Sequence, residues 1–109
     1  MSLRHAGYLA GLGVIGKNTL LTNATFGNRI TLGAALLNMA LEPDDLADYS
    51  FCSADCQICI RSCPAGALDG KRVNQKLCRE KCDGFTKKGD RIYLCNNCRK
   101  LCPNGKGIN

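Results

Sequence analysis

The residues with the clearest chemical potential are nine cysteines in a chain of 109 residues. Four of them fall between Cys52 and Pro64, and three more fall between Cys95 and Pro103. Both segments end in the pattern Cys-x-x-Cys-x-x-x-Cys-Pro. Closely spaced thiolates are typical ligands of zinc and of iron–sulfur clusters. The spacing therefore predicts a metal-binding protein.

The repeated pattern is close to the cysteine run of bacterial ferredoxins, in which three thiolates bind one cluster and the fourth binds the other. A Cys-x-x-Cys loop can direct both sulfur atoms at one site, whereas the three-residue gap turns the next thiol away. The proline that follows fixes φ at about −65° and removes an N–H group, which sets the direction in which the chain leaves. Two such runs predict two [4Fe–4S] clusters with exchanged ligands. The first run departs from the ferredoxin spacing, because three residues separate Cys52 from Cys56.

Two other kinds of cross-link compete with the iron–sulfur interpretation. The pairs Cys56/Cys59 and Cys95/Cys98 could form a four-thiolate zinc site in a module that binds other macromolecules. The gap between these pairs is longer than in most zinc ribbons, and five cysteines would have no role. Structural disulfides are less consistent with a chain that lacks a secretory signal. We therefore keep zinc as the alternative.

The charge is distributed unevenly along the chain. Residues 1–51 carry three Lys/Arg against four acidic residues, and residues 52–109 carry twelve against five, a net charge of +7. A [4Fe–4S] cluster with four thiolates carries a net negative charge, so much of this excess would compensate two clusters. The alternative interpretation of this positive charge is a basic surface that binds nucleic acid.

The sequence predicts no membrane association, because no apolar run approaches the about 20 residues of a membrane span. The absence of a secretory leader predicts a cytoplasmic protein. His5 is the only histidine, and we interpret it as a surface or turn residue and not as a catalytic base.

A Gly-x-Gly-x-x-Gly pattern occurs at Gly11, Gly13 and Gly16. In a dinucleotide-binding loop this pattern follows a strand and precedes a helix, and an acidic residue lies about 20 positions later. Too little chain precedes it here for a strand, and no acidic residue occurs before Glu42. We interpret the glycines as positions of close backbone packing.

The apolar pattern predicts an α+β fold with a ferredoxin-like double-cluster lobe, preceded by a short segment of strands and turns. The break at Glu42-Pro43-Asp44-Asp45 divides the chain into residues 1–45 and residues 46–109, the cluster-binding domain. The predicted helices are 5–11, 74–82 with Asn74 as its N-cap, and a helical turn in 96–102. The predicted strands are 19–22, 30–37 and 91–94, although the apolar residues of 30–41 also suit a helix.

Three features together resemble the epoxyqueuosine reductase family. They are Ala10–Leu21 with Phe26-Gly27 and Leu32-Gly33, the Cys56/Cys59/Cys63-Pro64 run, and the segment Asp90–Pro103. These features span almost the whole chain. A double Cys-Pro signature alone would be shared by many ferredoxin-like proteins.

The resemblance implies two [4Fe–4S] clusters in a module that transfers electrons to a redox partner protein or a corrinoid domain. It implies two sets of ligands: Cys52, Cys56, Cys59 and Cys102 for cluster 1, and Cys63, Cys78, Cys95 and Cys98 for cluster 2. Cys78 and Cys82 lie one helical turn apart and compete for one position. Cys78 fits the spacing of the family better, which leaves Cys82 without a role.

The family's reductase carries a long N-terminal region that helps to hold cobalamin and supplies the catalytic acid. The resemblance implies that this chain begins near the end of that region and that residues 1–45 are the tail of a truncated upstream α/β domain, so we expect a fragment or a stand-alone relative. Lys17 and Asn18 are candidates for cofactor binding in a longer parent protein. Cobalamin and tRNA are expected only through that parent. We do not expect this chain alone to reduce epoxyqueuosine in tRNA.

Overall fold

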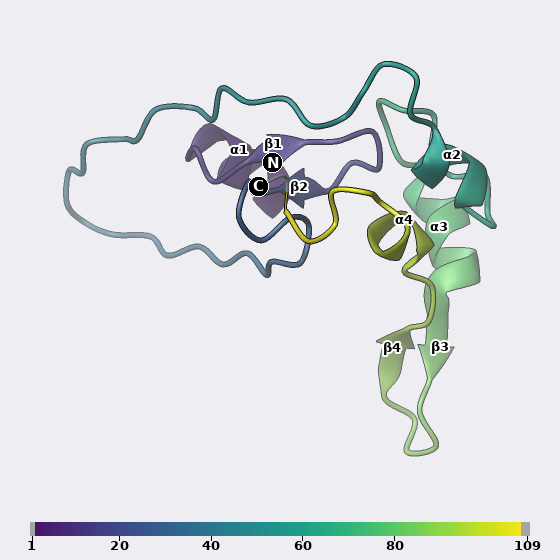
Figure 1. The fold of residues 1–109 in the computed structure, drawn as a ribbon. Coiled ribbons are helices and arrows are strands. Elements are labelled where there is room, and N and C mark those ends of the chain that lie inside the picture. The colour runs from purple at the N-terminus through teal and green to yellow at the C-terminus, as the bar shows by residue number, and fades with distance from the viewer. Residues whose placement is uncertain (1, 108–109) are drawn as a thin grey trace.

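The computed structural model describes residues 2–107, which form four short helices and two small antiparallel sheets (Figure 1). In chain order the elements are α1 (Leu3–Leu9), β1 (Val14–Ile15), β2 (Leu21–Thr22), α2 (Ile58–Ser62), α3 (Gln75–Cys82), β3 (Asp83–Phe85), β4 (Arg91–Tyr93) and α4 (Asn97–Lys100). The predicted mixture of helices and strands is confirmed.

The N-terminal elements form one small unit. Helix α1 begins at Leu3, because the hydroxyl of Ser2 accepts a hydrogen bond from the His5 amide and so caps the helix. The two-residue strands β1 and β2 pair antiparallel, with Val14 opposite Thr22. Helix α1 packs on this hairpin, where Gly7 lies against the buried side chain of Leu21.

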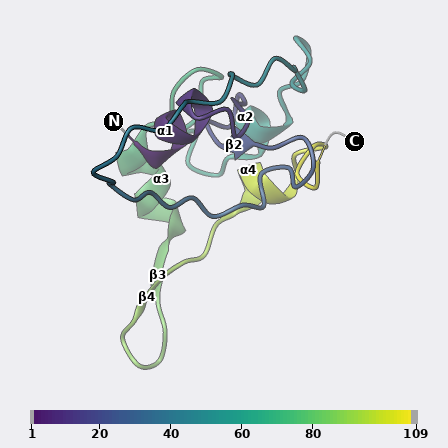
Figure 2. The same cartoon turned by 90° about the vertical axis from the view of Figure 1, so that its left-hand side faces the viewer.

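The cysteine-rich elements form a second group. Helices α2 and α4 pack together, and the amide of Asn97 donates to the carbonyl of Ser62 at 3.3 Å. Helix α3 begins after Asn74, whose side chain accepts from the Leu77 amide, as the sequence predicted. It runs directly into the β3–β4 hairpin, which projects from the body of the molecule in both views (Figure 2).

The predicted strand at 30–37 is wrong. Residues 29–57 contain no helix or strand and form a long loop that swings away from the N-terminal unit (Figure 1). A strand needs a neighbour to satisfy its amides and carbonyls, and no strand in the described part of the chain lies beside this segment. Its apolar side chains are therefore exposed, most of all Leu36, Leu37, Met39 and Leu41.

Residues 103–107, at the end of the described chain, pack against the backbone at Gly27. The backbone of Gly105 approaches Gly27 so closely that a side chain at position 27 would collide with it. The side-chain amide of Asn104 also donates to the carbonyl of Phe51 at 2.9 Å. Residues 103–107 therefore tie the segment after α4 to the N-terminal unit.

The Gly11/Gly13/Gly16 pattern follows helix α1 instead of a strand, so it is not a dinucleotide-binding loop. At Gly13 and Gly16 a side chain would meet the Thr22 backbone and the Phe51 ring, which bears out close packing as the role of these glycines. No helix in residues 2–107 has both the length and the apolar character of a membrane span.

Replacement of Gly27 by alanine should destabilise the protein by at least about 1–2 kcal/mol, because Gly27 has φ of +65° and its Cβ would meet the Gly105 backbone. Urea unfolding of the two variants Gly27→Ala and Gly33→Ala measures the effect. Gly33 has open space around it and serves as the matched control. Equal stability of the two variants would contradict the packing described here.

Candidate functional site

The nine cysteines gather in two groups that line two neighbouring cavities. The first group consists of Cys52, Cys56, Cys59 and Cys102. The second group consists of Cys63, Cys78, Cys82, Cys95 and Cys98. The two sets of four ligands predicted from the sequence thus fall on separate sides of this division, and the structure brings the members of each set together.

Helix α2 is the element that separates the two groups. It carries the buried Cys59 on the side of the first group and ends at Cys63, whose backbone is extended at φ −69° and ψ 112°. A residue that precedes proline is disfavoured in the helical region, so Pro64 stops the helix at this point. The change of direction directs Cys63 toward the second group.

Helix α4 reverses this arrangement. It carries Cys98 on the side of the second group, and Cys102, just before Pro103, lines the first. Each group therefore receives one cysteine from a Cys-Pro dipeptide that belongs to the other run. Helix α3 supplies Cys78 and Cys82, and Cys95, two residues after β4, completes the second group.

Burial and the neighbouring thiolates raise the pKa of two cysteines in the first group. Burial raises the pKa of the Cys59 thiol, and the thiolates of Cys52, Cys102 and Cys56 raise it further against the lowering effect of the Ile60 amide. Burial also raises the pKa of Cys102, where Cys52 and Cys56 add to the effect and the Asn104 amide opposes it.

The second group shows the same pattern. Burial raises the pKa of Cys98, and the neighbouring thiolates of Cys78, Cys63 and Cys95 raise it further, whereas Arg99 lowers it. Burial raises the pKa of Cys78 as well, followed by the effects of Cys82, Cys63 and Cys95. The cysteines that raise the pKa of Cys78 and Cys98 all belong to the second group.

The chemistry of the donors fits iron–sulfur clusters. Each group presents at least four thiols and lines its cavity without a histidine or a carboxylate among the described residues. Thiolates that repel one another in a partly buried site are stabilised by a cationic core, and soft sulfur ligands favour such clusters. The residues present therefore fit two clusters.

A single metal ion fits the geometry less well. In residues 2–107, no three side chains of His, Cys, Asp or Glu lie close enough to hold one ion. Tetrahedral zinc with Zn–S bonds of about 2.3 Å requires sulfur atoms about 3.8 Å apart. A four-iron cluster binds one thiolate at each corner and holds its ligands farther apart.

Lys17 makes its contacts with the loop of the first cysteine group. Its ammonium group donates to the carbonyls of Ser53, Ala54 and Cys56 at 2.8, 2.9 and 2.8 Å. One side chain from the N-terminal unit thus holds the backbone between Cys52 and Cys56.

Asn18 lies between the two groups. It is only 4% exposed and lines both cavities. Its amide donates to the Cys98 carbonyl at 3.0 Å, while its oxygen accepts from the Leu20 amide at 3.1 Å. Lys17 and Asn18, which the sequence analysis assigned to a cofactor, therefore contact the backbone that carries the cysteines.

Sequence reasoning missed a second contact between the N-terminal unit and α4. The guanidinium of Arg99 donates to the carbonyl of Asn28, and the amide of the fully buried Asn28 donates to the carbonyl of Arg99 at 3.3 Å. Asn28 and Arg99 lie 71 positions apart in the sequence, and no spacing pattern links them.

Cys82 differs from the other cysteines in its hydrogen bond. Its buried thiol donates to the carbonyl of Cys95 at 3.4 Å. Cys78 and Cys82 line the same cavity.

Comparison with known proteins shows a consistent similarity. The chain is 37% identical to epoxyqueuosine reductase from Staphylococcus aureus, over 92% of this chain and 28% of the relative. It is 34% identical to the enzyme from Listeria monocytogenes, over 90% of this chain and 28% of the relative. No family model matches the chain.

Solved structures agree with the sequence comparison. Epoxyqueuosine reductase from Bacillus subtilis superposes with a TM-score of 0.76 and 28% identity, over 99% of this chain and 31% of that protein. The structure from Streptococcus thermophilus gives 0.74 and 32%, over 96% of this chain and 30% of that protein. A further match, with a TM-score of 0.76 and 28% identity, was solved with an epoxyqueuosine-modified tRNA stem loop. This chain thus spans less than a third of its relatives, and the resemblance predicted from the sequence is confirmed.

Removal of the Lys17 ammonium group should loosen the loop between Cys52 and Cys56. The variant Lys17→Met loses three charge-assisted hydrogen bonds, each worth roughly 1–2 kcal/mol at most in this exposed setting. Amide hydrogen exchange of residues 53–57 should rise about tenfold or more. Lys88→Met, in the exposed β3–β4 turn, is the control, and equal exchange in both variants would contradict the proposed contact.

Proposed function

We propose that this chain, which is similar to epoxyqueuosine reductases over about nine tenths of its length, is an electron-transfer module with two [4Fe–4S] clusters. The observation that carries the proposal is the division of the cysteines into two groups that exchange their Cys-Pro thiols. This exchange is the ligand pattern of two-cluster ferredoxins. In this proposal residues 46–109 form a ferredoxin-like double-cluster lobe, and residues 1–45 form a separate unit that precedes it.

We assign the ligands by the cavities that they line. Cys52, Cys56, Cys59 and Cys102 hold cluster 1, and Cys63, Cys78, Cys95 and Cys98 hold cluster 2. When bound, the clusters supply one-electron transfer. The protein contributes partial burial of the thiols, the Lys17 contacts to one ligand loop and the Asn18 contact to the other. Asn18 fixes the two sites relative to each other, because it lines both cavities.

The names of the relatives suggest the process that the module serves. They are epoxyqueuosine reductases, and one structural neighbour was solved with a tRNA stem loop. In our proposal, electrons leave this module for a corrinoid that acts on modified tRNA in the cytoplasm, within a larger reductase. Zinc remains the alternative metal, but the separation of the thiols gives it no better support.

Metal analysis tests the proposal directly. Protein purified without oxygen should contain about eight iron and eight acid-labile sulfide per chain, as two four-iron clusters require. Zinc is counted in the same sample. Stoichiometric zinc without sulfide would overturn the iron–sulfur assignment.

The two cysteines of α3 should respond differently to replacement. Cys82→Ser should keep the full iron content, because we assign Cys78 and not Cys82 to cluster 2. Cys78→Ser should lose about half of the iron, since one of two clusters would lack a ligand. Iron content after gel filtration gives the answer, and the reverse result would make Cys82 the ligand.

A further inference from the structure

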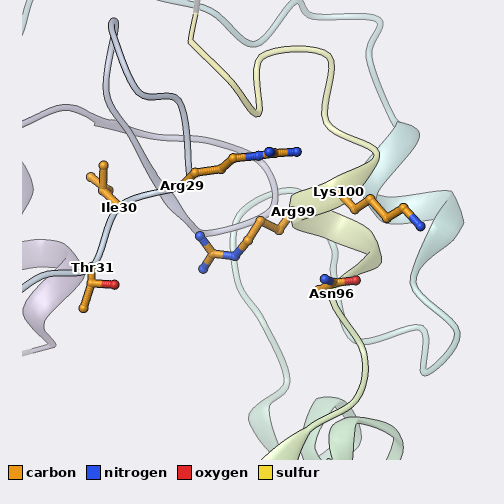
Figure 3. Close-up of a pocket in the computed structure, with 6 residues that line it drawn as sticks. All are labelled: Arg29, Ile30, Thr31, Asn96, Arg99 and Lys100. Carbon is orange, nitrogen blue, oxygen red and sulfur yellow. The ribbon is translucent and has the colours of Figure 1, made fainter.

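A cationic pocket lies between helix α4 and the segment after Asn28 (Figure 3). It has a volume of about 650 Å³ and is lined by Arg29, Ile30, Thr31, Asn96, Arg99 and Lys100. Arg29 and Lys100 are exposed, and Arg99 is half-buried. The segment after Asn28 and helix α4 thus place three positive side chains around one pocket, with Arg99 and Lys100 extending from α4 in different directions (Figure 3).

Side-chain hydrogen bonds to backbone carbonyls hold one wall of the cationic pocket together. Arg99 and Asn28 exchange hydrogen bonds through their side chains and carbonyls, which fixes α4 against residues 28–31. No acidic residue lines the pocket among those that the structure describes. The ion pair recorded in the described residues, Arg91–Asp83, lies away from it on the β3–β4 hairpin. Three like charges at one surface repel one another, and an external anion would relieve that repulsion.

The cationic pocket adjoins the second cysteine group. Arg99 lines both the pocket and the cavity of Cys63, Cys78, Cys95 and Cys98. Cys98 itself lies in α4 between the lining residues Asn96 and Arg99. A partner in the pocket would therefore be separated from the second group by little more than the short helix α4.

We propose that the cationic pocket is the docking site for an acidic protein that carries one electron, such as a small ferredoxin or flavodoxin. The partner's carboxylates would bind Arg29, Arg99 and Lys100, and the carrier would be oxidised by one electron as the cluster held by Cys98 is reduced by one. The inference rests on the proposed function. Electron entry explains why the positive charges adjoin the cysteine cavity, whereas a phosphate-binding surface has no need of that position.

The test compares two charge reversals of equal size in iron-loaded protein. The variant R29E/K100E reverses two charges of the cationic pocket, and K87E/K88E reverses two in the exposed β3–β4 turn. An acidic plant-type ferredoxin is titrated at an ionic strength of about 10 mM, where screening is weak. Its binding constant is measured first, and its rate of electron delivery is measured second. The methyl viologen radical cation serves as a reductant that needs no acidic surface.

R29E/K100E should weaken ferredoxin binding and slow its electron delivery about tenfold or more, whereas K87E/K88E should change both less than about threefold. Reduction by methyl viologen should not slow in either variant. Three results would overturn the inference: equal losses in the two variants, no binding of the ferredoxin or of an acidic flavodoxin by the unaltered protein, or loss of tRNA stem-loop binding with ferredoxin binding retained.

The iron and sulfide content of each sample distinguishes failure of the docking site from failure of the proposed function. A sample with both clusters that fails to dock the carrier overturns the docking site alone. A sample without sulfide overturns the proposed function itself.

Discussion

The rest of the structure depends on the convergence of thiols from distant segments. Among the described residues, the buried apolar side chains are only Leu21, Ala67 and Leu68 with the cysteines 59 and 82. Such a core supplies little hydrophobic free energy for a chain of this length. In our proposal, clusters held by the two cysteine groups cross-link the segments that meet there. Metal binding would then contribute directly to folding, as in other small metalloproteins.

The two cysteine runs repeat one local structure. The residues before α2 and α4, Gln57 and Asn96, have nearly the same backbone angles, φ −131° and ψ 20° against φ −137° and ψ 25°. Each helix then carries one cysteine, and a Cys-Pro dipeptide follows. Because the paired helices α2 and α4 pack together, the cysteine that leaves each helix reaches the other helix's site. Pro64 and Pro103 end the helical turns before them, so that each run contributes a cysteine to the site of the other run.

Local chemistry made part of this structure predictable from the sequence. The α3 helix with its Asn74 cap and the extended residues before Cys95 depend on neighbouring residues, and both occur as predicted. The grouping of the cysteines also followed from spacing together with the family resemblance. Helix α2 escaped prediction because five residues give too short a pattern to show a helical period.

The error at residues 30–37 arose because a strand depends on contacts across the chain. Residues 30–37 have the composition of a strand, but a strand forms only beside a partner, and composition does not report one. Likewise, the sequence marked Lys17 and Asn18 without indicating what they contact. Their partners are carbonyls 36 to 80 positions away, on the loops that carry the cysteines.

Charge links the cysteine groups to the surface around them. Buried thiolates raise one another's pKa, so the groups favour cations, and part of the net +7 charge of residues 52–109 can compensate clusters held there. Compensation does not require these cations to gather in a concave surface. Arg99 lowers the pKa of Cys98 and so acts on the cysteine group, whereas Arg29 and Lys100 line the same pocket and are exposed. Their position is better explained by a partner that approaches from solvent, because exposed charges are strongly screened from a buried site but remain available to an incoming anion.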